Sequence, residues 1–184
     1  MTKSLVRGLR LVAAATLVAG FLASPASSAH ASWTWTLTDG FETNAAATWS
    51  FDIAGSGQGT FEQYGDGPPH TGSWYADEVT FSGWIGVRRT IAVPISPGMH
   101  LPCTLMFWVM AQPGQKLNIE AIDQATWTYD GVKSLTTTAA GNTWVAYSTA
   151  FTTSASAVVV RLTAGNYTRY RVKVDDMYVT CTYA

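Results

Sequence analysis

The chain has 184 residues, and its eleven lysines and arginines nearly balance its twelve aspartates and glutamates, for a formal net charge of −1. The sequence has no basic cluster after its first ten residues, which argues against nucleic acid and an anionic membrane surface as partners. Only 12% of the residues are charged, and Gly, Ser, Thr and aromatic residues are frequent, as is typical of a folded, β-rich extracellular domain.

The first 31 residues have the three parts of a secretory signal peptide. A basic n-region precedes an apolar run from Leu11 to Ala23, and Ala29-His30-Ala31 has the A-x-A form of a cleavage site. The apolar run is too short to span a bilayer, and no stop-transfer pattern follows it. We therefore expect a secreted, extracellular protein without membrane insertion, which starts at Ser32 and forms a single domain over residues 32–184.

The remainder of the chain has the pattern of short β-strands separated by turns. Segments rich in Val, Ile, Thr, Tyr and Trp alternate with turn residues, and none shows helical periodicity. Gly55 to Gly59 is interpreted as a loop and Gly65 to Pro69 as a turn. In chain order, about ten strands are expected, at Trp33–Leu37, Ala46–Ile53, Trp74–Thr80, Trp84–Val93, Cys103–Ala111, Lys116–Asp123, Trp127–Thr138, Trp144–Thr153, Ala157–Ala164 and Tyr170–Tyr183. This pattern predicts an all-β fold, a two-sheet antiparallel β-sandwich.

The last expected strand carries two adjacent aspartates, Asp175 and Asp176, in an otherwise apolar stretch. Its period-two pattern indicates a strand with one buried face. An unpaired buried carboxylate is costly, so a cation or a backbone-rich loop is expected to lie against at least one of the two.

Cys103 and Cys181 are the two cysteines of the chain. In an exported protein a disulfide is favoured over two free thiols, and no CxxC spacing or nearby histidine supports a metal site at these cysteines. The bridge would close a loop of 78 residues.

Four motifs of the chain, in order, resemble those of one family. Asp39-Gly40-Phe41-Glu42 is similar to an opening "NGFE", His70 to Ala76 to "HSGSYAL", Thr104 to Val109 to the end of "VxVxPGxxYxLSFWV", and Val174 to Met177 supplies a closing "VDDM". Together they resemble the CenC-type carbohydrate-binding modules of families 4 and 9, which are galactose-binding-like jelly rolls. The resemblance covers nearly the whole mature chain. It also implies that Trp49, Phe51, Phe107, Trp144 and Phe151 are packing residues.

The resemblance implies a structural calcium ion. Calcium prefers six to eight oxygen ligands from carboxylates and backbone carbonyls. Carried over from the family, the ligands would be Glu42, carbonyls around His70 and Ser73, and Asp175, with Asp39 as a further carboxylate and Asp176 on the other surface. The alternative is that Asp175 and Glu42 accept hydrogen bonds from loop amides or pair with an arginine such as Arg171.

Several aromatic residues next to loop or turn signals are candidates for an open sugar site. Saccharide rings present apolar C–H faces that stack on Trp and Tyr, while their hydroxyls bind amides, carboxylates and guanidinium groups. The candidate ligand-binding residues are Tyr64, Trp84, Arg88, Arg89, Glu120, Trp127 and Tyr129. The sequence does not decide whether Trp108 packs in the core or lies in a groove.

The leading hypothesis is a secreted, non-catalytic domain that binds a polysaccharide or cell-surface glycan. We expect no nucleic-acid partner, and a separate secreted enzyme is a candidate partner. One alternative is a structural or protein-interaction β-sandwich without a sugar site. A small glycan-active enzyme is the third, since a glycosidase needs two carboxylates across one bond. Asp77 and Glu78 should point to opposite faces of a strand, and Glu120 could form such a pair with Asp123 or Asp66 only through tertiary geometry.

Overall fold

The computed structural model describes residues 32–65, 67–139, 141–165 and 170–183, so the expected signal peptide and its cleavage site lie outside the described residues. No helix in these described ranges is both long and apolar enough to span a membrane. The described elements are β1 (Trp33–Asp39), α1 (Ala45–Thr48), β2 (Ser50–Gln63), β3 (Trp74–Ala92), β4 (Leu101–Ala111), β5 (Lys116–Asp123), β6 (Tyr129–Thr136), β7 (Trp144–Thr153), β8 (Ala157–Ala164) and β9 (Tyr170–Tyr183).

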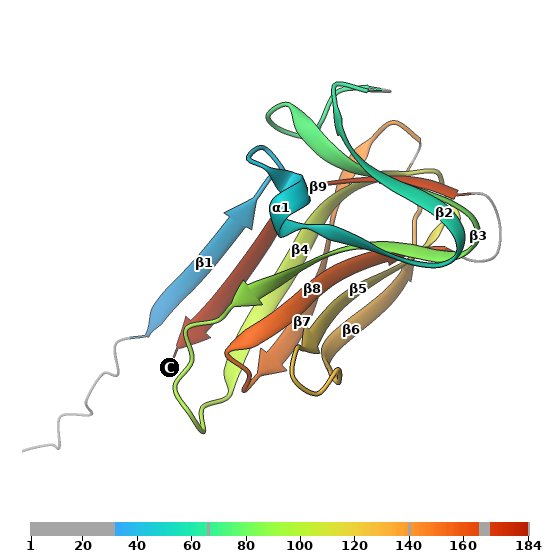
Figure 1. The fold of residues 1–184 in the computed structure, drawn as a ribbon. Helices are drawn as coiled ribbons and strands as arrows, with labels where there is room; N and C mark the ends of the chain where they lie inside the picture. The colour runs from blue at the N-terminus through green and yellow to red at the C-terminus, as the bar shows by residue number, and fades with distance from the viewer. Residues whose placement is uncertain (1–31, 66, 140, 166–169, 184) are drawn as a thin grey trace, which may run out of the picture. The chain divides into compact units, whose positions relative to one another are not determined.

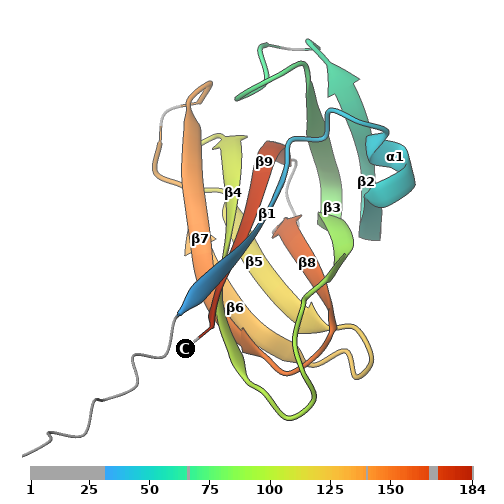
Figure 2. The same cartoon turned by 90° about the vertical axis from the view of Figure 1, so that its left-hand side faces the viewer.

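The strands form an antiparallel sandwich of two layers (Figures 1 and 2). The hydrogen-bonded order is β6-β5-β8-β3-β9-β4-β7, with β1 added to β9 and β2 added to β3. Strand β3 belongs to both layers, because Ile85–Ala92 pairs with β8 whereas Ala76–Thr80 pairs with β9. One layer therefore contains β6, β5, β8 and the end of β3, and the other contains β1, β9, β4, β7 and the start of β3. The predicted all-β sandwich is confirmed.

The structure has nine described strands instead of ten, and the differences fall on β2 and β3. The two strands predicted at 74–80 and 84–93 form one continuous strand, and the glycines predicted to form a loop at 55–59 lie inside β2. β2 is paired with β3 along its whole length, so ladder hydrogen bonds keep the Gly-rich segment extended. Gly83 has φ 77°, and a Cβ there would lie 1.9 Å from the carbonyl oxygen of Ala54. Because glycine has no Cβ, the two strands can approach this closely and β3 can bend at this position. The start of the strand predicted at 46–53 is helical instead, in α1.

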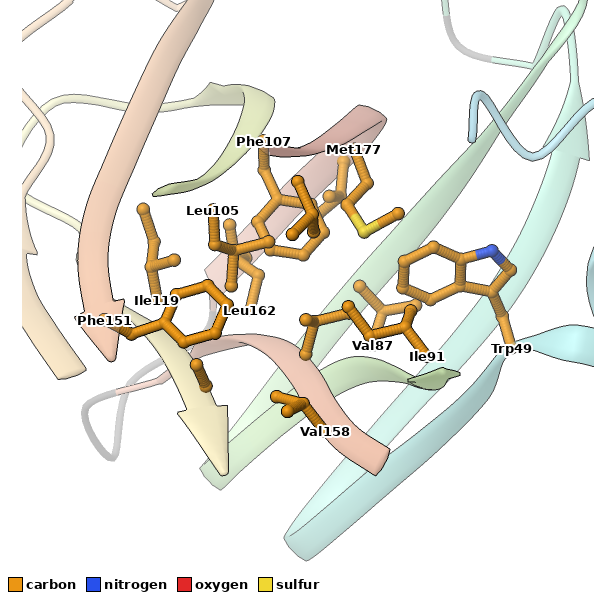
Figure 3. Packing of buried hydrophobic residues seen from close by; sticks show 14 of the residues in the cluster. Trp49, Val87, Ile91, Leu105, Phe107, Ile119, Phe151, Val158, Leu162 and Met177 are labelled. Carbon is orange, nitrogen blue, oxygen red and sulfur yellow. The ribbon is translucent and has the colours of Figure 1, made fainter. Parts of the chain in front are cut away.

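The core lies between the two layers (Figure 3). Alternate residues of β4, such as Leu105 and Phe107, face inward as predicted and meet β5 and β8 residues such as Ile119 and Leu162. Trp49 and Phe151 are buried in this cluster, and Phe51 packs against it, all as predicted. Trp144 was predicted to be core and is not, because its indole N–H donates to the carbonyl of Pro68, 3.3 Å away, outside the cluster.

A β-bulge in β9 changes which of its residues face the core. Trp108 of β4 lies opposite Asp175, and Met106 lies opposite Tyr178, so β9 contains one extra residue between these pairs. Asp176 is this extra residue, and its φ is 41°. Val174 therefore faces the core on one side of the bulge and Met177 on the other, so the core-facing positions change from even to odd numbers and the predicted strict alternation does not hold across the bulge.

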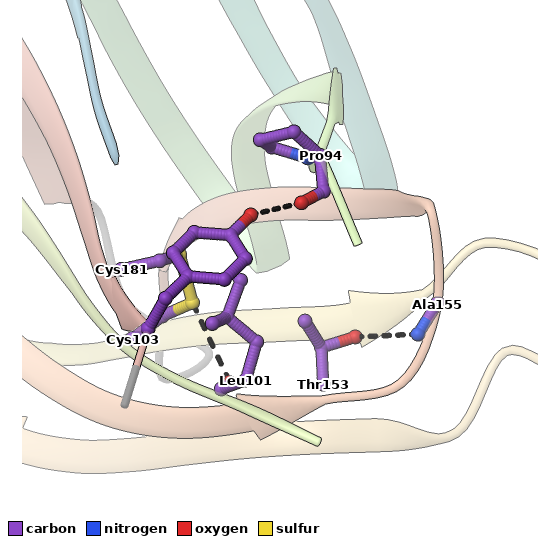
Figure 4. The surroundings of a disulfide bond; sticks show 7 residues. Pro94, Leu101, Cys103, Thr153, Ala155 and Cys181 are labelled. Atoms are coloured by element: carbon purple, nitrogen blue, oxygen red, sulfur yellow. Dashed lines mark hydrogen bonds between the residues drawn. A yellow bond between two sulfur atoms is a disulfide. The ribbon is translucent and has the colours of Figure 1, made fainter. Parts of the chain in front are cut away.

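The disulfide between Cys103 and Cys181 is present, as predicted (Figure 4). The two cysteines lie directly opposite each other on β4 and β9, with 78 positions of sequence between them. Nearby, the hydroxyl of Tyr183 donates to the carbonyl of Pro94. The bridge therefore ties the end of β9 to the centre of its layer and, on the chain-entropy model, is worth about 4 kcal/mol for a loop of this length.

Candidate functional site

A groove of about 630 Å³ lies on the outer face of the layer that contains β6, β5, β8 and the end of β3. Residues of β5 and β8 that alternate with the core residues line it, including Asn118, Glu120, Arg161 and Thr163. Its walls include exposed aromatic residues, which are described below. The groove therefore has a polar floor with charged groups on it.

Four charged side chains form a row across this face. Arg88 of β3 lies opposite Arg161 of β8, which lies opposite Glu120 of β5. Asp52 of β2 completes the row: its Oδ1 is 2.8 Å from Nε of Arg88, and its Oδ2 is 3.0 Å from a terminal guanidinium nitrogen of Arg161. Nε of Arg161 donates to Oε2 of Glu120. Two arginines thus stand side by side because two carboxylates neutralise them.

The pKa values of Glu120 and Arg161 reflect both burial and their mutual contact. Burial raises the pKa of Glu120, and the hydrogen bond and positive charge of Arg161 oppose that rise. Burial lowers the pKa of Arg161, but hydrogen bonds and negative charges from Glu120 and Asp52 outweigh this effect, so the pKa is raised overall. The guanidinium therefore stays protonated across the physiological pH range.

Two tryptophans are each backed by an arginine of this row. The guanidinium carbon of Arg161 is 5.2 Å from the ring centroid of Trp84, and that of Arg88 is 5.6 Å from the ring centroid of Trp127. Trp84 is 36% exposed and Trp127 is 54% exposed. Tyr129, which lines the groove, is 56% exposed. Large aromatic faces beside a polar floor are suited to sugar rings.

The structure brings together five of the seven predicted ligand-binding residues and separates the other two. Trp84, Arg88, Glu120, Trp127 and Tyr129 lie on or beside the outer face described above, in the pairings and contacts just given.

Arg89 and Tyr64 lie elsewhere. Because Arg89 follows Arg88 on the same strand, it points to the other side of the layer, where it pairs with Asp39 and lies 5.9 Å from the ring centroid of Trp49. The hydroxyl of Tyr64 contacts Ser73 in the loop before β3, at 3.2 Å.

Sequence reasoning missed Asp52 and Arg161. Each follows a core-facing residue in its own strand and therefore points to the outer face, and this alternation was visible in the sequence. Their pairing was not, because 109 positions separate them along the chain. Only the adjacency of β2, β3 and β8 brings their side chains within hydrogen-bond distance.

A second polar cluster lies where the loop before β3 meets the bulge of β9. Oδ2 of Asp175 accepts hydrogen bonds from the backbone N–H groups of His70 at 2.8 Å and Thr71 at 3.2 Å, and its Oδ1 accepts from the N–H of Asp176 at 2.8 Å. Burial raises the pKa of Asp175 to about 7, and the negative charge of Asp176 adds to the rise. Backbone amides thus hold this carboxylate.

Asp176 also faces the loop, although it was predicted to lie on the other surface. It lies 2.6 Å from Nδ1 of His70 and accepts a hydrogen bond from the hydroxyl of Thr71 at 2.8 Å. The positive φ of the bulge turns both neighbouring carboxylates to the same loop. Trp108 stacks on the ring of His70, with centroids 3.7 Å apart, so it contributes to this cluster and lies outside the groove.

The predicted calcium ligands gather partly at this cluster. Oε1 of Glu42 accepts hydrogen bonds from the N–H groups of Ser73 and Trp74, both at 2.8 Å. A Cβ built on Gly40 would lie 2.8 Å from Oδ1 of Asp176 and 3.9 Å from Oδ1 of Asp175, so the loop after β1 reaches the same place. Asp39 points away from it, to Arg89.

Asp175 and Glu42 accept hydrogen bonds from loop amides, which is the alternative to calcium ligation stated from the sequence. Arg171 does not contribute, since it pairs with Asp77 at 2.7 Å. Across the described part of the chain, no group of three or more His, Cys, Asp or Glu side chains is arranged to hold a metal ion.

Comparison with known proteins identifies the fold. No protein-family model matches the chain, and no curated protein matches it. Among solved structures, TmCBM61 in complex with β-1,4-galactotriose matches with a TM-score of 0.54 at 15% identity, covering 76% of this chain and 92% of that one. The CBM22-1 xylan-binding domain of Paenibacillus barcinonensis Xyn10C matches with a TM-score of 0.55 at 12% identity, covering 80% and 94%. A cyclase from Fischerella sp. TAU matches with a TM-score of 0.58 at 12% identity, covering 80% and 98%.

These similarities show that the chain has the jelly-roll fold found in carbohydrate-binding modules. The same fold occurs in the cyclase, so the architecture alone does not define an activity.

Proposed function

We propose that the chain is a secreted, non-catalytic carbohydrate-binding domain whose groove binds a polysaccharide or cell-surface glycan. The observation that carries the proposal is the pair of exposed tryptophans, Trp84 and Trp127, each backed by an arginine beside a polar floor. The sugar faces would stack on the free sides of the indoles, and the hydroxyls would bind Asn118, Thr163 and the charged row.

The charged row also supports a binding role over a catalytic one. A glycosidase needs one carboxyl group able to release a proton and a second one facing it across the bond. In the groove, Glu120 and Asp52 are both engaged by Arg161, and Asp77 is engaged by Arg171 on the other layer. We therefore propose that the domain itself is non-catalytic and that a separate secreted enzyme acts on the same glycan.

A glycan array in the presence of calcium tests the sugar site, with β-1,4-galactan and xylan as the first probes because two proteins of the same fold are described with such ligands. Trp84→Ala and Trp127→Ala should each weaken binding of a positive glycan by about tenfold or more, if stacking contributes as aromatic contacts usually do. Trp33→Ala is the matched control, since Trp33 is 50% exposed but stacks on Tyr183 in the other layer. Equal losses in all three variants would contradict the proposal.

We propose in addition that calcium binds at the cluster of Glu42, Asp175 and Asp176. The donor types are those that calcium prefers, carboxylates and the carbonyls of the loop around His70 and Ser73, and the side chains of Glu42, Asp175 and Asp176 would have to rearrange to surround an ion. A bound ion would supply the positive charge that the backbone N–H groups of the loop now provide in part. Some of the hydrogen bonds from these groups to Asp175 and Glu42 would be replaced by contacts with the ion.

Isothermal titration of the chelated protein with calcium tests the metal site, and Asp175→Asn should abolish the binding heat. A melting temperature that is the same in calcium and in chelator would contradict it. Secretion and CenC-type membership are also part of the proposal. Export from an expression host with an N-terminus at Ser32 would support secretion.

A further inference from the structure

Asp52 reaches across a neighbouring strand. It lies directly opposite Gly86 of β3, and Gly86 lies directly opposite Thr163 of β8. A side chain at position 86 would be crowded, since a Cβ there would lie 2.6 Å from Cγ2 of Thr163. No side chain stands on β3 between Asp52 and Thr163, and the carboxylate of Asp52 contacts Arg161, two strands away, at 3.0 Å.

The arginines need this carboxylate. Arg88 and Arg161 lie opposite each other on adjacent strands, and like charges in that position repel. Asp52 gives one oxygen to each guanidinium, 2.8 Å from Arg88 and 3.0 Å from Arg161. Glu120 neutralises Arg161 alone. Asp52 is thus the counterion shared by the two arginines.

Each arginine in turn lies against one tryptophan. Arg161 covers one side of Trp84, and Arg88 covers one side of Trp127. Trp127 sits in the turn between β5 and β6 with φ 56°, and Arg88 lies over its ring, 5.6 Å from the centroid.

We propose that Asp52 is the positioning residue for both stacking tryptophans, so that the ligand contacts at Trp84 and Trp127 are coupled through Arg161–Asp52–Arg88. The proposal rests on the proposed function of the groove for its biological meaning. The coupling itself is a property of the unliganded protein and can be measured without a glycan.

The experiment is ¹⁹F NMR of the protein with 5-fluorotryptophan at its eight tryptophan positions. Trp84→Phe and Trp127→Phe assign the two resonances. Asp52→Asn keeps the shape of the side chain and removes the charge, and we expect it to shift or broaden both resonances while the other six stay in place. If the spectrum of Asp52→Asn changes at one of the two rings or at neither, the proposal is overturned.

Two variants separate this effect from a general loss of structure. Glu120→Gln removes the other counterion of Arg161, so it should change the resonance of Trp84 directly and that of Trp127 through Asp52. Asp77→Asn breaks the ion pair with Arg171 in the other layer and should change neither. If Glu120→Gln still moves the resonance of Trp127 when it is combined with Asp52→Asn, the link does not run through Asp52, and the proposal fails.

A second variant covers the case in which Asp52→Asn does not fold. Arg88→Lys keeps the charge but removes the planar group that contacts Trp127, and it should move the resonance of Trp127 directly and that of Trp84 through Asp52. An effect confined to Trp127 would overturn the coupling.

A glycan that binds allows the functional test. In a double-mutant cycle, the losses for Trp84→Ala and Trp127→Ala should be non-additive by about three- to tenfold in the wild type and additive in Asp52→Asn. If no glycan binds but the fluorine resonances behave as expected, the proposed function fails while the positioning role of Asp52 stands. Additive losses in the wild type would overturn the coupling even if the glycan binds.

Discussion

The groove and the cluster at the bulge of β9 both contain buried or half-buried carboxylates, but they are neutralised by different means. In the groove, Asp52 and Glu120 are held by arginines. At the bulge, Asp175 is held by backbone N–H groups, with a histidine next to its neighbour Asp176. An arginine keeps its charge at any physiological pH, whereas amides supply only partial charge. We therefore expect the bulge cluster to respond to both protons and cations more strongly than the groove, where Arg161 opposes the rise that burial causes in the pKa of Glu120.

The largest expected effect tests the groove side of this comparison. Arg161→Ala would leave Glu120 and Asp52 without their shared guanidinium in a site where the arginine side chain is 11% exposed, and should lower the free energy of unfolding by about 3–5 kcal/mol. Urea denaturation measures this loss. Arg89→Ala, which also breaks an arginine–aspartate pair but outside the groove, is the control. A loss below that of the control would show that the row is not mutually dependent.

The pH dependence of stability tests the bulge side. In the folded protein the pKa of Asp175 is about 7, well above its ordinary 3.8, so between these values the folded state keeps a proton that the unfolded chain has released. The stabilising contribution is complete below pH 3.8 and is lost as the pH rises towards 7. Chelated protein should therefore become less stable over this window, by on the order of 2 kcal/mol.

Asp175→Asn isolates this contribution, because burial raises the pKa of Glu78 as well and adds a slope of the same sign. Chemical denaturation of the chelated proteins between pH 4 and 8 should show a flatter profile for the variant. If calcium binds at this cluster as proposed, added calcium should oppose the loss above pH 7, because it would bind the ionised carboxylate. Identical profiles for the two proteins would remove Asp175 as the source.

The smallest expected effect concerns the histidine of the bulge cluster. His70→Ala removes the contact with Asp176 and the stacked ring on Trp108, and should cost about 1 kcal/mol at pH 6. Thermal unfolding with and without chelator measures it. His100→Ala, in the loop before β4, is the matched control and should leave the melting temperature unchanged. A stabilised His70→Ala protein would mean that the imidazole opposes the carboxylates' arrangement.

Several features followed from the sequence because they depend on local pattern or on a count. Four strands, at 116–123, 144–153, 157–164 and 170–183, have the predicted bounds, since alternation of apolar and polar residues is read within one strand. The pairing of Cys103 with Cys181 followed from there being two cysteines in the chain. Turn signals next to Trp84 and Trp127 marked them as exposed.

Other features depend on which strands become neighbours, and they were decided by the tertiary structure. The extra residue at Asp176 turns two adjacent carboxylates to one loop, against the local alternation. Asp52 meets Arg161 because β2 and β8 both pair with β3 in the register that brings the two side chains together. The sequence by itself determined the strands, the disulfide and the aromatic candidates, because these are short-range properties. Which way each charged side chain points, and which residue it pairs with, depend on residues far apart in the sequence. The register between the strands decided both.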